Sequence, residues 1–293
     1  MNTDARESGA LPVPPPVPVD DPRVTELRQL LAIIDTLRAP GGCPWDAEQT
    51  QASMAPCLVE EAHELVEAIE SGGVPERAAE AGDVLTALAL VCRIAEDDQD
   101  FDLGVAAKVA ATKLVRRHPH VFGEAGARSS GEVLQSWEEI KRAERAEEGT
   151  DTSALAGVPH AMPALQLAGR VCRKAVGAGF HWKDARGALA KLEEELDELR
   201  EVLPVDLLAS AARPKVPEGE VRARIEHELG DVMMAAAFLG GYLGLDPEAM
   251  CRVAVKRFDT RFRYMEEKLG GSVTGHTLDE MLTQWNQAKE VTE

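Results

Sequence analysis

Pairs of carboxylates recur at helical spacing in four places along this 293-residue chain. The two acidic residues of each pair are three positions apart, so a helix would carry both side chains on one face. Like charges placed this close repel each other unless a cation neutralises them. The pairs are Glu61 and Glu64, Glu80 and Asp83, Glu195 and Glu198, and Glu228 and Asp231. One such pair in an acidic chain is most simply a solvated face, so the surroundings must decide.

Two of the pairs stand at the start of nearly all-apolar segments, 84–91 and 232–239. A helix that is apolar all round is expected to be buried. Desolvating an unpaired charge costs several kcal/mol, whereas the helix dipole returns only about 0.3–1 kcal/mol. Carboxylates that meet there therefore need a cation. Oxygen ligands without thiolates suit Mg²⁺ or Mn²⁺, and Mg²⁺ often shares its shell with substrate phosphates. The pattern predicts a metal-dependent site for a phosphorylated ligand.

Basic residues follow the acidic pairs in both halves of the chain. They can clamp phosphate oxygens, or they can be ordinary partners of helix C-termini, and the sequence leaves both interpretations open. The first half supplies Lys113, Arg116, Arg117 and Lys141, and the second supplies Arg257, Arg261, Arg263 and Lys289.

Tryptophans stand at corresponding places in the two halves. Trp45 and Trp182 each follow a glycine-containing turn and precede an acidic helix, where each is either a wall against a nucleobase or an anchor in the core. Trp137 and Trp285 each precede a lysine by four positions, so each Trp–Lys pair shares one helix face.

The carboxylates, basic residues and tryptophans occur in the same order twice. The offset between the copies is 148 for Glu80 and Glu228, 144 for the basic pair and 134 for the first glutamates. Fifteen residues separate Glu64 from Glu80, whereas 29 separate Glu198 from Glu228. The order and spacing indicate an internal duplication with loops of different length.

Apolar residues recur at steps of three and four, as in Leu27, Leu30, Leu31, Ile34 and Leu37, and no sustained alternation of period two occurs. The predicted class is therefore all-α. The Pro-rich segment at 11–20 predicts a disordered tail over 1–21. We expect a first domain over 22–147, a linker over 148–160 and a second domain over 161–293.

Composition excludes several classes of function. The 32 Lys and Arg against 51 Asp and Glu give a net charge of −19, which argues against nucleic acid or an anionic membrane as a partner. Five cysteines without a CxxC motif support neither a disulfide framework nor a zinc knuckle and favour a reducing cytoplasm. The longest apolar run, 232–245, is too short to span a membrane.

A di-iron oxidase bundle is one alternative, because Glu60 and His63 form a Glu-x-x-His motif. Such bundles use two of these motifs. The second copy has Asp197 at the corresponding position, so this alternative is disfavoured.

Taken together, the ordered motifs resemble the MazG family of nucleoside triphosphate pyrophosphohydrolases. The resemblance covers the chain after the Pro-rich tail and includes a second MazG-like copy. Its motifs are Gly42-Cys43-Pro44-Trp45-Asp46, Glu60-Glu61-x-x-Glu64, Glu80-x-Gly-Asp83 and Arg116-Arg117-His118-Pro119-His120-Val121-Phe122.

The resemblance implies two tandem all-α domains of the four-helix-bundle type that form a homodimer. It also implies Mg²⁺-dependent cleavage of NTPs or dNTPs between the α and β phosphates. The products would be the nucleoside monophosphate and pyrophosphate, and the role would be housecleaning of the nucleotide pool. The alternative is a non-catalytic nucleotide-binding or regulatory module with degenerate metal sites.

Carried over by position, the resemblance gives each copy four metal ligands and a basic residue that contacts phosphate, Lys113 or Arg257. The ligands are Glu61, Glu64, Glu80 and Asp83, and Glu195, Glu198, Glu228 and Asp231. We expect Glu60 or Glu194 to accept a proton from water, and Arg261 to balance charge on pyrophosphate. Trp45, Arg117, Lys141, Trp182, Trp285 and Lys289 are the expected substrate-binding residues.

The second copy departs from the family pattern in two ways. Val255 stands where active second domains usually carry Asn, and 203–217 looks like an insertion. Its complete set of carboxylates nevertheless favours the second copy as the working one.

Overall fold

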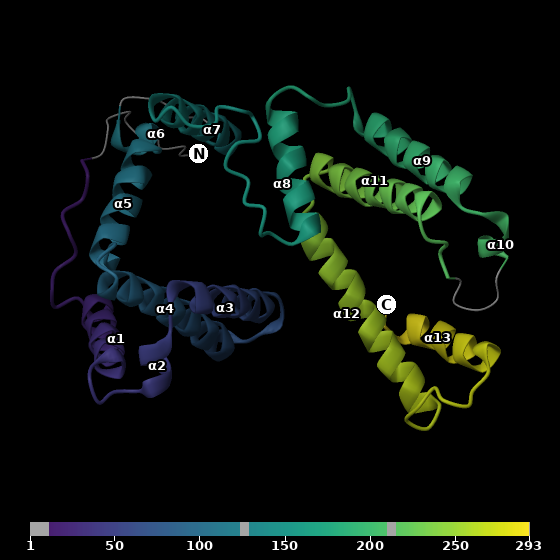
Figure 1. Ribbon diagram of the computed structural model, residues 1–293, viewed down its shortest axis with the longest axis horizontal. Helices are drawn as coiled ribbons and strands as arrows, with labels where there is room; N and C mark the ends of the chain where they lie inside the picture. The colour runs from purple at the N-terminus through teal and green to yellow at the C-terminus, as the bar shows by residue number, and fades with distance from the viewer. Residues whose placement is uncertain (1–11, 124–128, 210–214, 293) are drawn as a thin grey trace, which may run out of the picture. The chain divides into compact units, whose positions relative to one another are not determined.

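The computed structural model describes residues 12–123, 129–209 and 215–292, and these residues form thirteen α-helices and no strand (Figure 1). The predicted all-α class is confirmed. The chain divides into two compact units, Met1–Lys141 and Arg142–Glu293. Residues 12–20 form no helix and are exposed, while the rest of the predicted tail, 1–11, lies outside the described residues. The predicted domain boundaries and the duplication stay predictions.

The first unit is built around two helices that pack side by side, α3 and α4. A two-residue turn, Gly72-Gly73, joins them, so they run antiparallel (Figure 1). Ile34 of α1 shares a hydrophobic core with Met54 of α3 and with Ala89, Leu90 and Ile94 of α4. The unit contains α1 (Pro22–Arg38), α2 (Pro44–Glu48), α3 (Gln51–Ser71), α4 (Val74–Asp97), α5 (Leu103–Arg116), α6 (Pro119–Phe122) and the first part of α7 (Ser130–Glu147).

The second unit has a corresponding central pair, α9 and α11, with α8 packed along α11. The remaining long helix of the unit, α12, packs against α13. Its helices are α8 (Ala164–Gly177), α9 (Ala185–Val202), α10 (Val205–Leu208), α11 (Glu220–Tyr242), α12 (Pro247–Lys268) and α13 (Leu278–Thr292).

Local capping explains where α3 begins. The Thr50 hydroxyl accepts a hydrogen bond from the Ser53 amide at 3.1 Å, and the Ser53 hydroxyl accepts one from the Thr50 amide at 2.9 Å. This capping box satisfies two amides that would otherwise lack partners.

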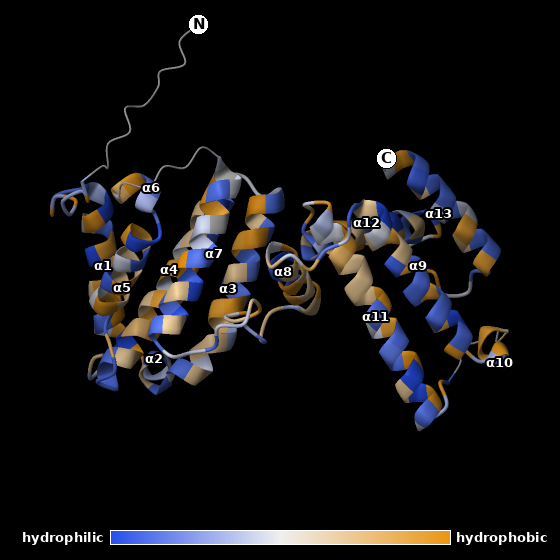
Figure 2. Cartoon of the chain, turned by 90° about the horizontal axis from the view of Figure 1, so that it is seen from above, coloured by the Kyte–Doolittle hydropathy of each residue, from blue (hydrophilic) through white to orange (hydrophobic). Residues whose placement is uncertain are grey.

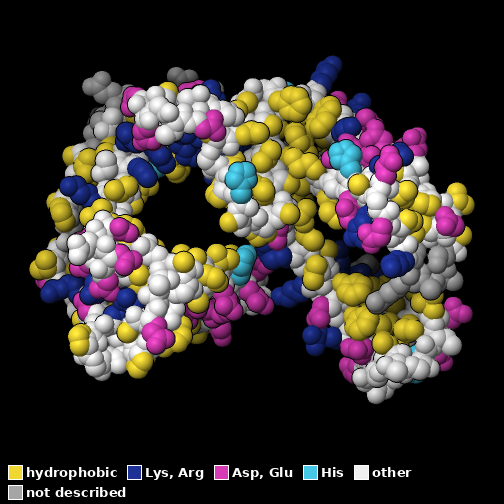
Figure 3. Space-filling model, in the orientation of Figure 1, with side chains coloured by type: hydrophobic (Ala, Val, Ile, Leu, Met, Phe, Trp, Pro, Cys, Tyr) yellow, Lys and Arg dark blue, Asp and Glu magenta, His cyan; other side chains and the backbone are white. Residues whose placement is uncertain are grey.

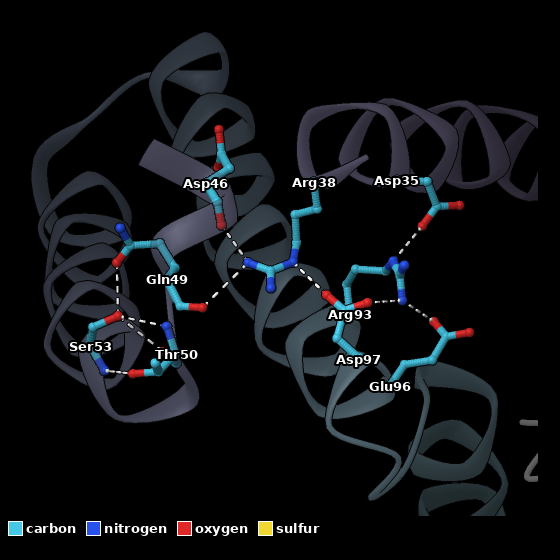
Figure 4. Close-up of polar contacts among 9 residues, drawn as sticks. All are labelled: Asp35, Arg38, Asp46, Gln49, Thr50, Ser53, Arg93, Glu96 and Asp97. Atoms are coloured by element: carbon cyan, nitrogen blue, oxygen red, sulfur yellow. Dashed lines mark hydrogen bonds and ion pairs between the residues drawn. The ribbon is translucent and has the colours of Figure 1, made fainter. Parts of the chain in front are cut away.

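A polar network then fixes α3 against its neighbours (Figure 4). Arg38 is the centre of this network and is almost fully buried. Its guanidinium donates to the Asp97 carboxylate at 2.8 Å and to the carbonyls of Asp46 and Gln49. Arg93 adds ion pairs to Asp97 and to Asp35 of α1. The network ties the last turn of α4 to α1 and to the chain that leads into α3.

The expectation that the helices after Asp83 and Asp231 are buried all round is wrong. In α4, Ala87, Ala89 and Leu90 are buried, but Leu85 and Leu88 on another face are exposed. In α11 the hydrophilic N-terminal half gives way to an apolar C-terminal half (Figure 2), where Met233 is 55% exposed. Within the described part of its own unit, neither face is covered by another helix.

None of the helices in the described ranges is both long and apolar enough to cross a membrane. The five cysteines are free thiols, and Cys92 and Cys172 are buried.

Two acidic clusters as candidate metal centres

The central helix pair of the first unit brings three predicted metal ligands together. Glu61 and Glu64 lie one turn apart on α3 and face Glu80 of α4, and one oxygen of each carboxylate lies within 4.8 Å of the others. Glu61 and Glu80 are half-buried, whereas Glu64 is exposed. In Figure 3, acidic side chains gather over the end of the α3–α4 pair where the two helices are joined. The two helices therefore hold carboxylate oxygens at the separations that one divalent ion can bridge.

Partial burial and like-charge repulsion perturb the protonation of this cluster. Partial burial, followed by the charges of Glu64 and Asp83, raises the pKa of Glu61 above the ordinary value. The pKa of Glu80 is raised for the same reasons, with a hydrogen bond to Glu64 adding to the effect. Among the described residues no basic side chain forms an ion pair with these three carboxylates. The cluster thus carries excess negative charge that a cation would neutralise.

The second unit repeats the arrangement on α9 and α11. Oxygens of Glu195, Glu198 and Glu228 lie within 4.8 Å of one another. Glu195 is buried, with 7% of the residue exposed. Partial burial and the proximity of Glu195 raise the pKa of Glu198.

The fourth predicted ligand of each copy lies outside its cluster as the structure describes it. Asp83 is close enough that its charge raises the pKa of Glu61 and Glu80. Asp231 instead pairs with His227, one turn earlier on α11, at 3.4 Å. That both aspartates serve as ligands remains a prediction.

Sequence reasoning missed Lys191 in the second cluster. Its ammonium lies 2.8 Å from a carboxylate oxygen of Glu195 and 2.9 Å from one of Glu194. The spacings of three and four residues on one helix were the available signal. The hydrogen bonds to Glu195 and then Glu194 raise the pKa of Lys191 further, so it stays protonated at neutral pH.

The two predicted proton acceptors differ in their surroundings. Glu60 lies on the exposed side of α3 and lines an open groove of about 760 Å³ together with His63, Glu64 and Glu67. Glu194 is held by Lys191. Glu60 is therefore the more accessible carboxylate of the two.

The predicted basic residues of the first unit lie on elements other than α3 and α4. Lys113 is exposed in the last turn of α5, and Arg117 follows as the C-cap residue of that helix. Lys141 lies 2.7 Å from Glu138 and over the ring of Trp137 on α7. In Figure 3, Lys and Arg side chains gather near α6, at the end of α5 remote from α4. The structure of one chain does not bring these cations to the acidic cluster of that unit.

In the second unit, Arg257 is exposed on α12, where it lines a hollow of about 400 Å³ with Asp246, Met250 and Val253. Arg261 lies one turn further along α12, and its Nε donates to the Thr292 hydroxyl at 3.0 Å. Lys289 is half-buried on α13. These residues lie on α12 and α13, whereas the acidic cluster lies on α9 and α11.

The tryptophans separate into two kinds. Trp45 on α2 is 55% exposed, so it is no core anchor. Trp182 packs edge-on against Phe238 of α11, with ring centroids 4.7 Å apart, and its carbonyl accepts a hydrogen bond from the Tyr242 hydroxyl. Trp182 thereby anchors the start of α9 on α11. Trp285 packs against Phe258 at 5.0 Å.

The disfavoured di-iron motif finds no partner in the described second unit. His63 lines the α3 groove, while Asp197, at the corresponding position, forms an ion pair with Arg200 one turn away.

Comparisons with known proteins agree with this architecture. Residues 49–122, which run from α2's end through α6, match the model of the MazG nucleotide pyrophosphohydrolase domain. The chain is 34% identical over 270 residues to a nucleoside triphosphate pyrophosphohydrolase of Escherichia coli K12, an alignment that covers 91% of this chain and 98% of that protein. It is 35% identical over 266 residues to a nucleoside triphosphate pyrophosphohydrolase/pyrophosphatase MazG of Thermotoga maritima, covering 89% of this chain and 94% of the relative.

Proposed function

The chain belongs to the MazG family, whose full-length relatives are nucleoside triphosphate pyrophosphohydrolases, and we propose that it hydrolyses NTPs or dNTPs at the bond between the α and β phosphates. Water would attack the α phosphorus, the bond from that phosphorus to the bridging oxygen would break, and the products would be the nucleoside monophosphate and pyrophosphate. Such an enzyme removes unwanted nucleotides from the pool. The observation that carries the proposal is the pair of carboxylate clusters on corresponding helices.

The clusters fit a hard divalent cation. Each offers three carboxylate oxygens within 4.8 Å, and the described parts of the clusters contain no thiolate or imidazole ligand. Such a donor set suits Mg²⁺, with Mn²⁺ as a substitute. Glu61, Glu64 and Glu80 would hold the ion in the first unit, and Glu195, Glu198 and Glu228 in the second. When bound, the ion would neutralise phosphate charge and acidify a water molecule.

Glu60 is the better candidate to accept the proton of the attacking water. It lies beside the cluster, as its effect on the pKa of Glu61 indicates, and faces the open groove. Glu194 would first have to part from Lys191. The nucleotide would occupy the groove side of α3, with its phosphates toward the cluster.

A second copy of the chain would complete this site. Each unit leaves apolar residues exposed on a helix that carries its cluster, among them Leu88 on α4 and Met233 on α11. Apolar helix faces of this kind are covered in a symmetric dimer. The predicted basic residues, which lie on helices other than the cluster's within their own unit, would then approach it from the partner. Light scattering would give twice the monomer mass if the homodimer forms.

The decisive experiment removes one carboxylate from each cluster by Glu80→Gln together with Glu228→Gln. We expect Mg²⁺-dependent release of pyrophosphate from NTPs to fall by about a hundredfold, because loss of even an outer-shell partner of a metal ligand typically costs about 10- to 100-fold and these glutamates would bind the ion directly. The matched control combines Glu96→Gln and Glu226→Gln, which make the same change on the same helices outside the clusters.

Product identity and single variants complete the test. Pyrophosphate with monophosphate supports cleavage at the α–β bond, whereas orthophosphate with diphosphate contradicts it. Each single variant reports which unit performs the turnover. Full activity in the double variant would refute the assignment of the clusters, and tight nucleotide binding without turnover in the unaltered protein would favour a regulatory module.

A further inference from the structure

The two acidic clusters differ at the position one turn before their first ligand. Because Glu195 lies 134 residues after Glu61, the residue that corresponds to Lys191 in the first unit is Cys57. Lys191 lies one turn before Glu195 on α9, with its ammonium 2.8 Å from that carboxylate. Cys57 lies one turn before Glu61 on α3 and packs against the apolar core of its unit. A cation thus stands beside one cluster and an uncharged thiol beside the other.

Lys191 acts on the buried part of its cluster. The Glu195 side chain is only 9% exposed, and the Lys191 side chain is 36% exposed, so solvent screens their attraction incompletely. In the first unit, no basic side chain among the described residues forms an ion pair with Glu61, Glu64 or Glu80.

We propose that Lys191 is an internal counter-cation of the second cluster and competes with a free divalent ion for it, so that the second cluster binds such an ion more weakly than the first. This inference rests on the proposed function only in taking both clusters as metal sites. An incoming ion either displaces the ammonium from Glu195 and loses that ion pair, or leaves it in place and is repelled by its charge. Both routes lower the affinity.

The two clusters would therefore fill at different concentrations of the free ion. Partly exposed ion pairs contribute up to about 1 kcal/mol, which corresponds to a difference of roughly fivefold in affinity. Over that range the first unit would hold its ion while the second still holds its lysine.

Binding of Mn²⁺ to the full-length protein, measured by electron paramagnetic resonance without nucleotide, tests this inference. Glu228→Gln leaves the first cluster intact, and Glu80→Gln leaves the second. We expect the first cluster to bind Mn²⁺ roughly fivefold more tightly than the second. Adding Lys191→Met to the Glu80→Gln protein should close most of that gap.

The control is Arg200→Met in the same Glu80→Gln protein. It removes one positive charge from the same helix, but Arg200 pairs with Asp197, outside the cluster. We expect the affinity to change less than about twofold. Circular dichroism verifies that each variant is folded.

If Lys191→Met prevents folding, a reciprocal variant still tests the inference. Cys57→Lys in the Glu228→Gln protein places a lysine at the same spacing from Glu60 and Glu61, and it should weaken binding to the first cluster. Equal affinities of the two clusters, or unchanged affinity in both lysine variants, would overturn the inference and leave the metal sites standing. Absence of Mn²⁺ binding to either cluster would overturn the inference together with the metal sites.

Discussion

Gly187→Ala should test how the second unit positions its cluster, because a methyl group at this point of α9 has no room. A Cβ built on Gly187 would lie 2.6 Å from Cδ1 of Trp182 and 2.7 Å from both its Cβ and its Cγ. Two of these three atoms are at the base of the side chain, so rotation of the indole ring cannot relieve the clash. The backbone at the start of α9 must move instead, and the contact between Trp182 and Phe238 must loosen.

The magnitude follows from two opposed effects. Overpacking of this kind typically costs about 1–3 kcal/mol, and loss of the aromatic contact adds about 0.5–1.5 kcal/mol. Replacing a helical glycine by alanine returns about 0.5–1 kcal/mol. The free energy of unfolding should therefore fall by about 1–3 kcal/mol, which lowers the urea midpoint of the second unit by roughly 0.5–1.5 M.

Urea unfolding followed by circular dichroism and tryptophan fluorescence measures the change. Gly177→Ala is the matched control, because Gly177 lies in α8 of the same unit and a Cβ there meets nothing within 4 Å. That variant should be as stable as the unaltered protein or slightly more stable. If Gly187→Ala unfolds at the same urea concentration as Gly177→Ala, the anchoring role of Trp182 is refuted.

Two further predictions concern the first unit. The raised pKa values of Glu61 and Glu80 mean that the folded protein binds these protons more tightly than the unfolded chain, so protonation stabilises the fold. In the absence of metal, the free energy of unfolding should therefore fall as the pH rises above the ordinary glutamate pKa of 4.5. Mg²⁺ should reverse this fall near neutral pH. Urea titrations at several pH values, with Mg²⁺ and with a chelator, measure both effects. Arg38→Met should lower the free energy of unfolding of this unit by about 2–3 kcal/mol, because the buried guanidinium donates hydrogen bonds to Asp97 and to two carbonyls. A melting temperature within about 1 °C of that of the unaltered protein would contradict this prediction.

The helices and the acidic clusters could be predicted from the sequence because both depend on short-range spacing. Apolar residues at steps of three and four specify helices, and the three-residue spacing of Glu61 and Glu64 places them on one face. That Glu80 would join them required only that the next helix fold back, which Gly72-Gly73 indicates. The convergence of carboxylates from neighbouring helices, on which the enzymatic interpretation depends, is present in both units.

Burial and side-chain partners could not be predicted in the same way. Segment composition alone does not distinguish a helix buried in its own domain from one with an exposed face, so the expectation for Leu85 and Met233 was wrong. Trp45 and Trp182 occupy similar sequence contexts, yet only Trp182 meets an aromatic ring on a distant helix. These outcomes depend on contacts between residues far apart in the chain, which no local pattern encodes.

The two units also indicate what determines the geometry of the clusters. Fifteen residues lie between Glu64 and Glu80, and 29 lie between Glu198 and Glu228, yet in both units the oxygens lie within 4.8 Å. A connection that differs this much in length cannot set the distance between the helices it joins. Packing does so instead, through the core around Ile94 in one unit and the Trp182–Phe238 contact in the other. Because the cluster depends on the helix pair and not on the connection, the loop can change freely, while a single side chain such as Lys191 changes the charge of the cluster without moving its ligands.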